Sequence, residues 1–96
     1  MEDHGTRLKR LTMRSWRRGT REMDLILGPF ADAELAGMEP QALDAYERLL
    51  DENDQDLYPW ITARLSGGTA GPDAHRTILD RVARHARGRL REIRGA

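Results

Sequence analysis

The chain has 96 residues and a mass of 11.0 kDa, which is enough for one small domain with a single core. It has no cysteine, and this excludes disulfides, thiolate metal ligands and a cysteine nucleophile. The formal net charge is zero, so the basic excess typical of a nucleic-acid-binding domain is missing. A chain without cysteine suits a reducing compartment, and we expect a cytoplasmic location.

The charges are unevenly distributed along the chain. Residues 1–21 hold seven basic and two acidic side chains, residues 22–56 hold one basic and eleven acidic, and residues 57–96 hold eight basic and three acidic. This order has two explanations: helices that pair electrostatically within one domain, or separate patches that each contact a partner. We favour pairing within the domain.

No targeting segment or membrane span is expected. The basic start is not followed by the apolar run of a signal peptide, and Glu2 and Asp3 are atypical of an acid-poor transit peptide. The longest apolar run is too short to cross a bilayer, which takes about 20 residues. We therefore expect a soluble protein that does not insert into a membrane.

The hydrophobic spacing predicts helices throughout and no strand. Leu8, Leu11 and Trp16 share one side of a first helix, over residues 6–18. Gly19 ends this helix, either because the chain needs a left-handed residue there or because another backbone approaches closely. Five arginines lie on another side of this helix: Arg7, Arg10, Arg14, Arg17 and Arg18.

Two further helices follow the first. A second helix, over residues 21–36, has Thr20 as its N-cap and is bent at Pro29. A third helix starts at Pro40 and ends near Glu52. The expected buried residues are Met23, Ile26, Leu27, Phe30 and Leu35 in the second helix and Leu43, Tyr46, Leu49 and Leu50 in the third.

The last two helices are separated by a flexible glycine-rich loop, residues 66–72. Asp54 caps the fourth helix, and Asp73 caps the fifth. The expected apolar contacts are Leu57, Trp60, Ile61 and Leu65, then Ile78, Leu79, Val82, Ala86, Leu90 and Ile93. The expected fold is an all-α, compact five-helix bundle, a single domain of residues 1–96 with its core at about 7–90 and frayed termini.

The sequence predicts neither a catalytic nor a metal site. His4, His75 and His85 lack the helical i, i+4 spacing of a ligand pair. The glycine-rich loop lacks the Gly-Lys-Ser/Thr ending of a phosphate-binding loop. Ser15 and Ser66 have no His with an acidic partner nearby in the sequence. We therefore expect no catalytic residues and no bound metal, and we do not expect an enzyme.

The arginine side of the first helix suggests phosphate binding, because a row of arginines neutralises a polyanion. The acidic segment that follows would repel the same polyanion, and arginine also pairs well with carboxylates. Nucleic acid is therefore not an expected partner. A helical nucleic-acid-binding or regulatory protein-interaction module remains the alternative function.

The most unusual local feature is the segment Arg18-Gly19-Thr20-Arg21-Glu22, in which opposite charges at i, i+4 flank a glycine at a helix junction. A surface ion pair stabilises a protein by only about 0.3 to 0.5 kcal/mol, so stability explains the combination poorly. The segment is either a capped turn with a surface ion pair or part of an interface. Tyr58 is either a half-buried aromatic residue or an anchor for a partner.

These residues resemble the small succinate dehydrogenase assembly factors, which promote covalent flavinylation. Arg18-Gly19-x-x-Glu22 is similar to the Arg-Gly-x-x-Glu signature of that family. Residues 23–30, 46–50 and 54–61 resemble further blocks of the family, in the same order and at similar spacing, so the resemblance covers about residues 7–90. Gln55 and Pro59 depart from the pattern of the third block, which affects where the fourth helix starts.

The resemblance implies a chaperone-like assembly factor and not an enzyme. Its partner would be the flavoprotein subunit of succinate dehydrogenase, and often that of fumarate reductase. It would assist attachment of FAD to a histidine of that subunit. FAD would be attached to the partner. Since the sequence has no glycine-rich dinucleotide fingerprint, we expect the chain itself to bind no flavin and to be a monomer when free.

On this resemblance the helix junction is a docking site. Arg18 would make a bidentate contact with a partner carboxylate, Gly19 would let the partner backbone approach, and Glu22 would pair with a basic group. The factor would hold the flavoprotein with its histidine and FAD correctly placed. The residues assigned to partner binding are Arg14, Arg17, Arg18, Gly19, Arg21, Glu22, Asp24 and Tyr58.

Overall fold

The chain is helical over most of its length. The computed structural model describes the backbone of residues 1–95 and the side chains of residues 1–89. This described part contains five α-helices and no strand, which confirms the predicted all-α five-helix fold. The helices are α1 (His4–Trp16), α2 (Arg21–Glu34), α3 (Pro40–Leu50), α4 (Asp54–Leu65) and α5 (Arg76–Gly95), with 3-10 turns at Leu35–Gly37 and Asp73–His75.

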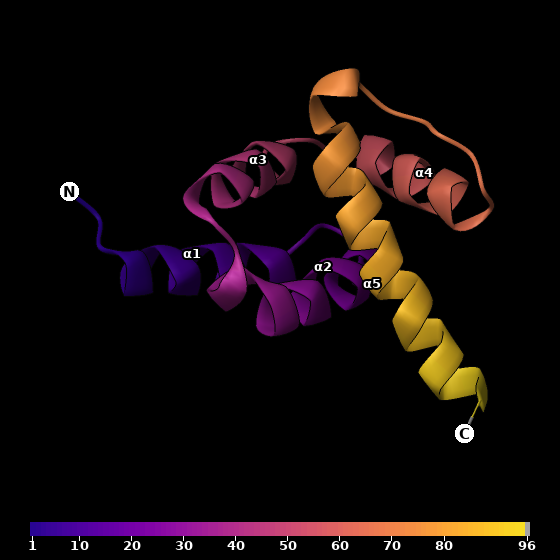
Figure 1. The fold of residues 1–96 in the computed structure, drawn as a ribbon, viewed down its shortest axis with the longest axis horizontal. Coiled ribbons are helices and arrows are strands. Elements are labelled where there is room, and N and C mark those ends of the chain that lie inside the picture. The colour runs from indigo at the N-terminus through magenta and orange to yellow at the C-terminus, as the bar shows by residue number, and fades with distance from the viewer. Residues whose placement is uncertain (96) are drawn as a thin grey trace.

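The helices pack around one core. α1 and α2 lie side by side, and α5 crosses α2 obliquely while its first half lies against α4 (Figure 1). The radius of gyration is 13.0 Å, as expected for a folded domain of this length. One side of each helix is apolar at i, i+3 and i+4 spacing, which is why these segments form helices that bury one side. The fully buried apolar side chains include Leu11, Met23, Leu27, Phe30, Leu43, Tyr46, Leu49, Leu57, Ile61, Leu79 and Val82.

Some helix ends differ from those predicted. α1 begins at His4, two residues early, because the Asp3 carboxylate accepts the Thr6 N–H at 2.7 Å and caps the helix. α5 begins at Arg76, because Asp73–His75 form a 3-10 turn before it. Within the described residues, no helix has both the length and the apolarity that a membrane crossing requires.

α2 is one helix, as predicted. Thr20 caps it by accepting the Met23 N–H at 3.3 Å, and the helix continues past Pro29 before ending in the 3-10 turn. The side chains of Leu90 and Ile93, expected in the core of the fifth helix, lie outside the described residues.

The close contact between α1 and α2 depends on Gly28. A Cβ atom at Gly28 would lie 2.3 Å from the Trp16 ring, so only glycine lets the indole lie against α2. The Trp16 indole N–H donates to the Asp32 carboxylate at 3.2 Å. Trp16 remains 39% exposed and therefore lies at the edge of the core.

Ion pairs join α1 to α3. The hydrogen bond from Arg10 holds the pKa of the Glu47 carboxyl below its ordinary value. The pairs are Arg7 with Asp44 and Glu47, Arg10 with Glu47, and Arg14 with Asp51, at 2.6 to 3.1 Å. These pairs confirm the prediction that the first basic stretch pairs with the acidic stretch inside the domain.

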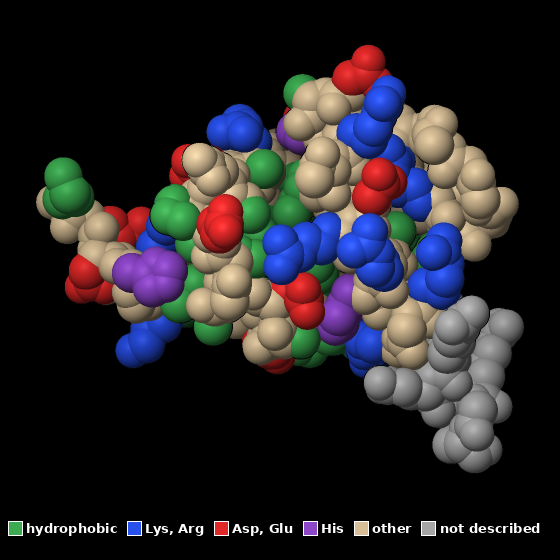
Figure 2. All heavy atoms as spheres, in the orientation of Figure 1, with side chains coloured by type: hydrophobic (Ala, Val, Ile, Leu, Met, Phe, Trp, Pro, Cys, Tyr) green, Lys and Arg blue, Asp and Glu red, His purple; other side chains and the backbone are tan. Residues whose placement is uncertain are grey.

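On the face shown in Figure 2, Lys and Arg side chains also gather along α5.

The glycine-rich loop is tied to α4 by Arg64, whose side chain is only 5% exposed. The Arg64 guanidinium donates to the carbonyls of Trp60 and Ala70, and its Nε donates to Asp80 Oδ1 at 2.8 Å. The sequence predicted a flexible linker, and in the structure the Ala70 carbonyl of this loop accepts a hydrogen bond from Arg64. The sequence does not predict this role, because an arginine is rarely buried unless it has partners, and the sequence does not identify those partners.

Candidate functional site

The link between α1 and α2, residues 17–20, is held by two carboxylates. The Arg18 backbone N–H donates to Asp24 Oδ1, and the Gly19 N–H donates to Asp54 Oδ2, both at 2.6 Å. One carboxylate comes from the first turn of α2 and the other from the first residue of α4. The signature glycine therefore lies in a segment whose backbone is fixed from both sides.

The Arg18 side chain turns inward. Its Nε donates to Asp54 Oδ1 at 2.8 Å, and its Nη1 and Nη2 donate to the carbonyls of Leu50 and Glu52, each at 2.7 Å. The side chain is 10% exposed, and that of Asp54 is 12% exposed. The cation stabilises the carboxyl-terminal end of α3, where helical carbonyls lack partners. Arg18 thus pairs with Asp54 and not with Glu22, and its guanidinium binds this chain's own backbone where the sequence suggested a partner carboxylate.

Gly19 is needed for a close approach and not for a left-handed backbone. Among the described residues, only Gly67 and Gly71 have positive φ. A Cβ atom at Gly19 would lie 3.1 Å from Asp54 Oδ2, closer than most such contacts. Of the two explanations drawn from the sequence, the first is therefore wrong, and the close neighbour within the chain is the Asp54 carboxylate.

The residues around this link form one continuous exposed surface. One groove is lined by residues 17–20 and 52–55, and a second by residues from α2 and α4, including Glu22. The two grooves share Thr20, Asp54 and Gln55. Tyr58 is 42% exposed and lines the second groove. We call the exposed part of this area the junction surface: Arg17, Gly19, Thr20, Glu22, Asn53, Gln55, Tyr58 and Pro59.

The structure brings together only some of the residues assigned to partner binding. Arg17, Gly19, Glu22 and Tyr58 lie on the junction surface. Arg21 is exposed but lines neither of its grooves. Two of the assigned residues are engaged inside the molecule instead: Arg14 pairs with Asp51, the residue after α3, and the Asp24 carboxylate accepts the Arg18 N–H.

Sequence reasoning missed the central role of Asp54. It was expected to be the N-cap of the fourth helix, and this is wrong: Asn53 occupies the N-cap position, and Asp54 is the first residue of α4. The Asp54 carboxylate binds Arg18 and Gly19, more than 30 positions away, so no local spacing encodes the contact. The one available signal was its place in a block that resembles the flavinylation factors.

Tyr46, from another of those blocks, is part of the core. Its hydroxyl lies 2.6 Å from Ser15 Oγ, and its ring packs on Phe30 with centroids 5.3 Å apart. Burial raises the pKa of Tyr46 to about 12, so the hydroxyl stays protonated at neutral pH. Its role is to join α1 to α3.

Within the part of the chain that the structure describes, no three His, Asp or Glu residues are placed to hold a metal ion.

Comparison with known proteins finds a family and several relatives. A family model described as flavinator of succinate dehydrogenase matches residues 9–86. Three relatives are named succinate dehydrogenase assembly factor 2, mitochondrial. The Meyerozyma guilliermondii protein is 37% identical over 94 residues, covering 96% of this chain and 69% of the relative. The Mycosarcoma maydis protein is 39% identical, covering 80% and 36%, and the Aspergillus terreus protein is 49% identical, covering 64% and 21%.

The names of these relatives correct one prediction. All three are called mitochondrial, which contradicts the cytoplasmic location expected from the sequence and points to mitochondria. The expectation was wrong because the lack of cysteine excludes disulfides without distinguishing one reducing compartment from another. This chain spans about a third or less of the Mycosarcoma and Aspergillus relatives.

The match covers the elements that build the site. The family model includes all of α2, α3 and α4 and most of α1, with the link between α1 and α2 near its start. The Meyerozyma relative aligns with almost the whole chain. The chain therefore belongs to the family of flavinators of succinate dehydrogenase.

Proposed function

We propose that this chain is a chaperone-like assembly factor that binds the flavoprotein subunit of succinate dehydrogenase and promotes covalent attachment of FAD to it. Membership of the flavinator family supports the assembly role. The observation that carries the docking proposal is that exposed Glu22 and Tyr58 line one groove beside a link held by hydrogen bonds. In this proposal the chemical step belongs to the partner.

The rigidity of the link supports docking at this position. Arg18 and Asp54 hold the ends of α1, α3 and α4 together, so the exposed neighbours are presented in one arrangement before a partner binds. A preordered surface loses less conformational entropy on binding than a mobile one, which favours affinity. Arg18 is a positioning residue in this view, and the direct contacts come from the junction surface.

Glu22 and Tyr58 supply complementary kinds of contact. Glu22 is exposed, and no cation lies within ion-pairing distance of it among the described side chains, so its carboxylate is available to an Arg or Lys of the partner. Tyr58 offers a large aromatic side chain with a polar tip, which is typical of the residues that dominate binding energy at interfaces. Gly19 is exposed in the adjoining groove, where it adds no side chain that a partner backbone would have to avoid.

The mechanism that we propose is selection of a conformation. By binding one state of the flavoprotein more tightly than others, the factor raises the fraction in which the acceptor histidine and FAD are correctly placed. Correct placement lowers the barrier of the bond-forming step without any catalytic group from this chain.

The experiment that tests this function measures covalent flavin on the flavoprotein subunit by in-gel fluorescence, in a strain that lacks the endogenous factor. We expect the wild-type chain to raise the signal and Glu22→Ala to raise it much less. Glu39→Ala is the matched control, because Glu39 is also exposed and makes no side-chain bond at the start of its helix. A signal that is the same with and without the wild-type chain would show that the proposal is wrong.

A further inference from the structure

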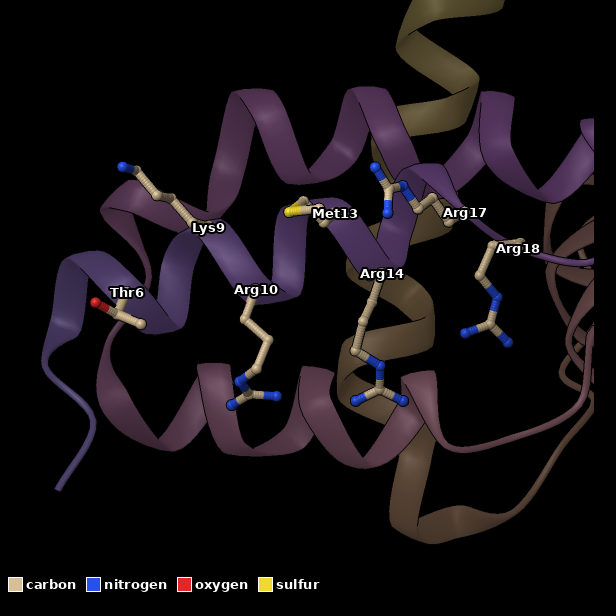
Figure 3. Close-up of a pocket in the computed structure, with 7 residues that line it drawn as sticks. All are labelled: Thr6, Lys9, Arg10, Met13, Arg14, Arg17 and Arg18. Carbon is tan, nitrogen blue, oxygen red and sulfur yellow. The ribbon is translucent and has the colours of Figure 1, made fainter.

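A shallow groove runs along α1 and reaches Arg17 and Arg18 in the link that follows it. Figure 3 shows Lys9, Met13 and Arg17 in succession on one side of the helix, while Arg10 and Arg14 point to the other side. That other side faces α3, where Glu47 pairs with Arg10 and Asp51, just after the helix, pairs with Arg14. We call this the α1 groove, and its lining residues are Thr6, Lys9, Arg10, Met13, Arg14, Arg17 and Arg18.

The cations of the α1 groove fall into two groups. Arg10, Arg14 and Arg18 are already paired with acidic residues of α3, of its C-cap and of α4, respectively. Lys9 and Arg17 are exposed, and among the described side chains no carboxylate lies within ion-pairing distance of either. Two uncompensated positive charges are therefore left on the same side of α1.

An apolar strip separates these two charges. Met13 lies between Lys9 and Arg17 in the sequence and is 49% exposed. The lining of the groove is mostly apolar, and besides Met13 its carbon surface comes from Thr6 and the aliphatic stems of Lys and Arg. Lys9, Met13 and Arg17 follow one another at four-residue spacing, so the backbone positions of the two cations are about 12 Å apart along the helix axis. The groove thus presents the order cation, apolar, cation.

We infer that the α1 groove binds an acidic segment of the flavoprotein partner, in which one apolar side chain covers Met13 and two flanking carboxylates pair with Lys9 and Arg17. The inference rests on the proposed function for the identity of the partner. A helix with Asp or Glu at i and i+8 and an apolar residue at i+4 has the matching 12 Å spacing, about eight residues of rise. Arg17 also lines the junction surface, so one partner can cover both surfaces without a gap.

Two other polyanions fit the α1 groove less well. Recruitment to an anionic membrane takes clusters of about four to eight basic residues, and only Lys9 and Arg17 are uncompensated here. A nucleic acid carries closely spaced phosphates, and the carboxylates of Glu47 and Asp51, which pair with Arg10 and Arg14, would repel them. A short segment with two carboxylates meets neither obstacle, because it needs only two cations.

The test measures the dissociation constant for the isolated flavoprotein subunit with variants that lie in the α1 groove and outside the junction surface. We expect Lys9→Glu to raise the constant roughly tenfold and to weaken its dependence on salt, because an interfacial charge pair becomes a repulsion. Met13→Ser should raise it as well, by removing the apolar contact. Arg48→Glu is the matched control: Arg48 is exposed on α3, outside the α1 groove, and the same charge change there should leave the affinity unchanged.

Each outcome decides the inference. If Lys9→Glu and Met13→Ser bind like the wild type while Glu22→Ala binds more weakly, the α1 groove does not contact the partner and the proposed function stands. If the wild type does not bind the flavoprotein, both proposals are wrong. Binding to vesicles of phosphatidylserine and phosphatidylcholine that Lys9→Glu abolishes, with no change in flavoprotein affinity, would assign the groove to a membrane and overturn the inference. Thermal melts that match the wild type confirm that Lys9→Glu and Met13→Ser are folded.

Discussion

Arg18 and Asp54 lie 36 positions apart and form an ion pair in which Arg18 Nε is 2.8 Å from Asp54 Oδ1 and neither side chain is more than 12% exposed. The other Asp54 oxygen accepts the Gly19 N–H at 2.6 Å. Arg18 also satisfies two carbonyls at the end of α3. This single pair therefore joins the link after α1 to α3 and α4, and it sets the position of the exposed residues around it.

Asp54→Asn should destabilise the fold. The substitution removes the charge that Arg18 faces and weakens the bond to the Gly19 N–H, so we expect a loss of about 2 to 4 kcal/mol in the free energy of unfolding. Urea unfolding followed by circular dichroism measures the loss. Asp56→Asn, at an exposed position in the first turn of α4, is the control and should change stability little. Equal stability of the two variants would mean that the pair does not hold the helices together.

Gly28→Ala should destabilise the contact between α1 and α2. Its Cβ would lie 2.3 Å from the Trp16 ring, so either the indole or the helix must move, at a cost of about 1 to 3 kcal/mol. A double-mutant cycle with Trp16→Ala identifies the cause. Once the indole is absent, Gly28→Ala should cost almost nothing, and a cost that persists in the Trp16→Ala background would contradict this account.

Much of the fold follows from the spacing of apolar residues. Leu43, Tyr46, Leu49 and Leu50 were assigned to a buried side by their helical period, and all four are buried. The inward turn of Arg18 does not follow from any such pattern, because its partners come from residues more than 30 positions away. Local spacing offered only Glu22 as a partner at i+4, and the chain's own fold supplied a better one.

For a similar reason, only part of the candidate site could be predicted from the sequence. Resemblance to a family pointed to Glu22 and Tyr58, and the structure places both on one groove. Nothing in the sequence distinguishes the paired arginines of α1 from Arg17, which has no acidic partner among the described side chains, because pairing depends on which of them faces α3. Counting charges therefore identifies a basic helix, but it does not identify which of its cations are left without an acidic partner.

Acid should weaken the bond between α1 and α3. The hydrogen bond from Arg10 lowers the pKa of Glu47, so the ionised form stabilises the fold above the ordinary carboxyl pKa of about 4.3, and that contribution is lost as pH falls through the lowered value. Glu47→Gln should be less stable than the wild type near neutral pH, and the difference should shrink below about pH 4. Urea unfolding across this range measures it. A difference that does not vary with pH would show that Glu47 acts through packing and not through charge.

The purified chain should be a monomer without bound flavin. We expect this because the proposed function leaves FAD on the partner. In addition, the described residues contain no unit in which a strand, a glycine-rich turn and a helix follow one another, which is the unit that holds a dinucleotide. Absorbance in the visible range and light scattering on a sizing column measure the two properties. A yellow preparation with flavin near one equivalent would overturn the expectation.

Gly19 offers the sharpest test of the junction surface. Its φ is not positive, so alanine meets no backbone penalty, and its Cβ would need to move only slightly from Asp54 Oδ2 at 3.1 Å. We expect Gly19→Ala to lower stability by about 1 kcal/mol and to retain most flavinylation activity. Gly19→Arg adds a long cation beside Arg17, where the partner must approach, and should lose most of that activity.

The comparison of the two Gly19 substitutions separates folding from docking. Covalent flavin on the flavoprotein subunit is scored by in-gel fluorescence, after melts and soluble levels of both variants have been matched to the wild type. A folded Gly19→Arg variant that supports full flavinylation would mean that this link is only a turn between α1 and α2. Loss of activity in Gly19→Arg alone, with Gly19→Ala near normal, would instead require that a partner occupies the space above Gly19, because the two substitutions place the same Cβ beside Asp54 and differ in what extends beyond it.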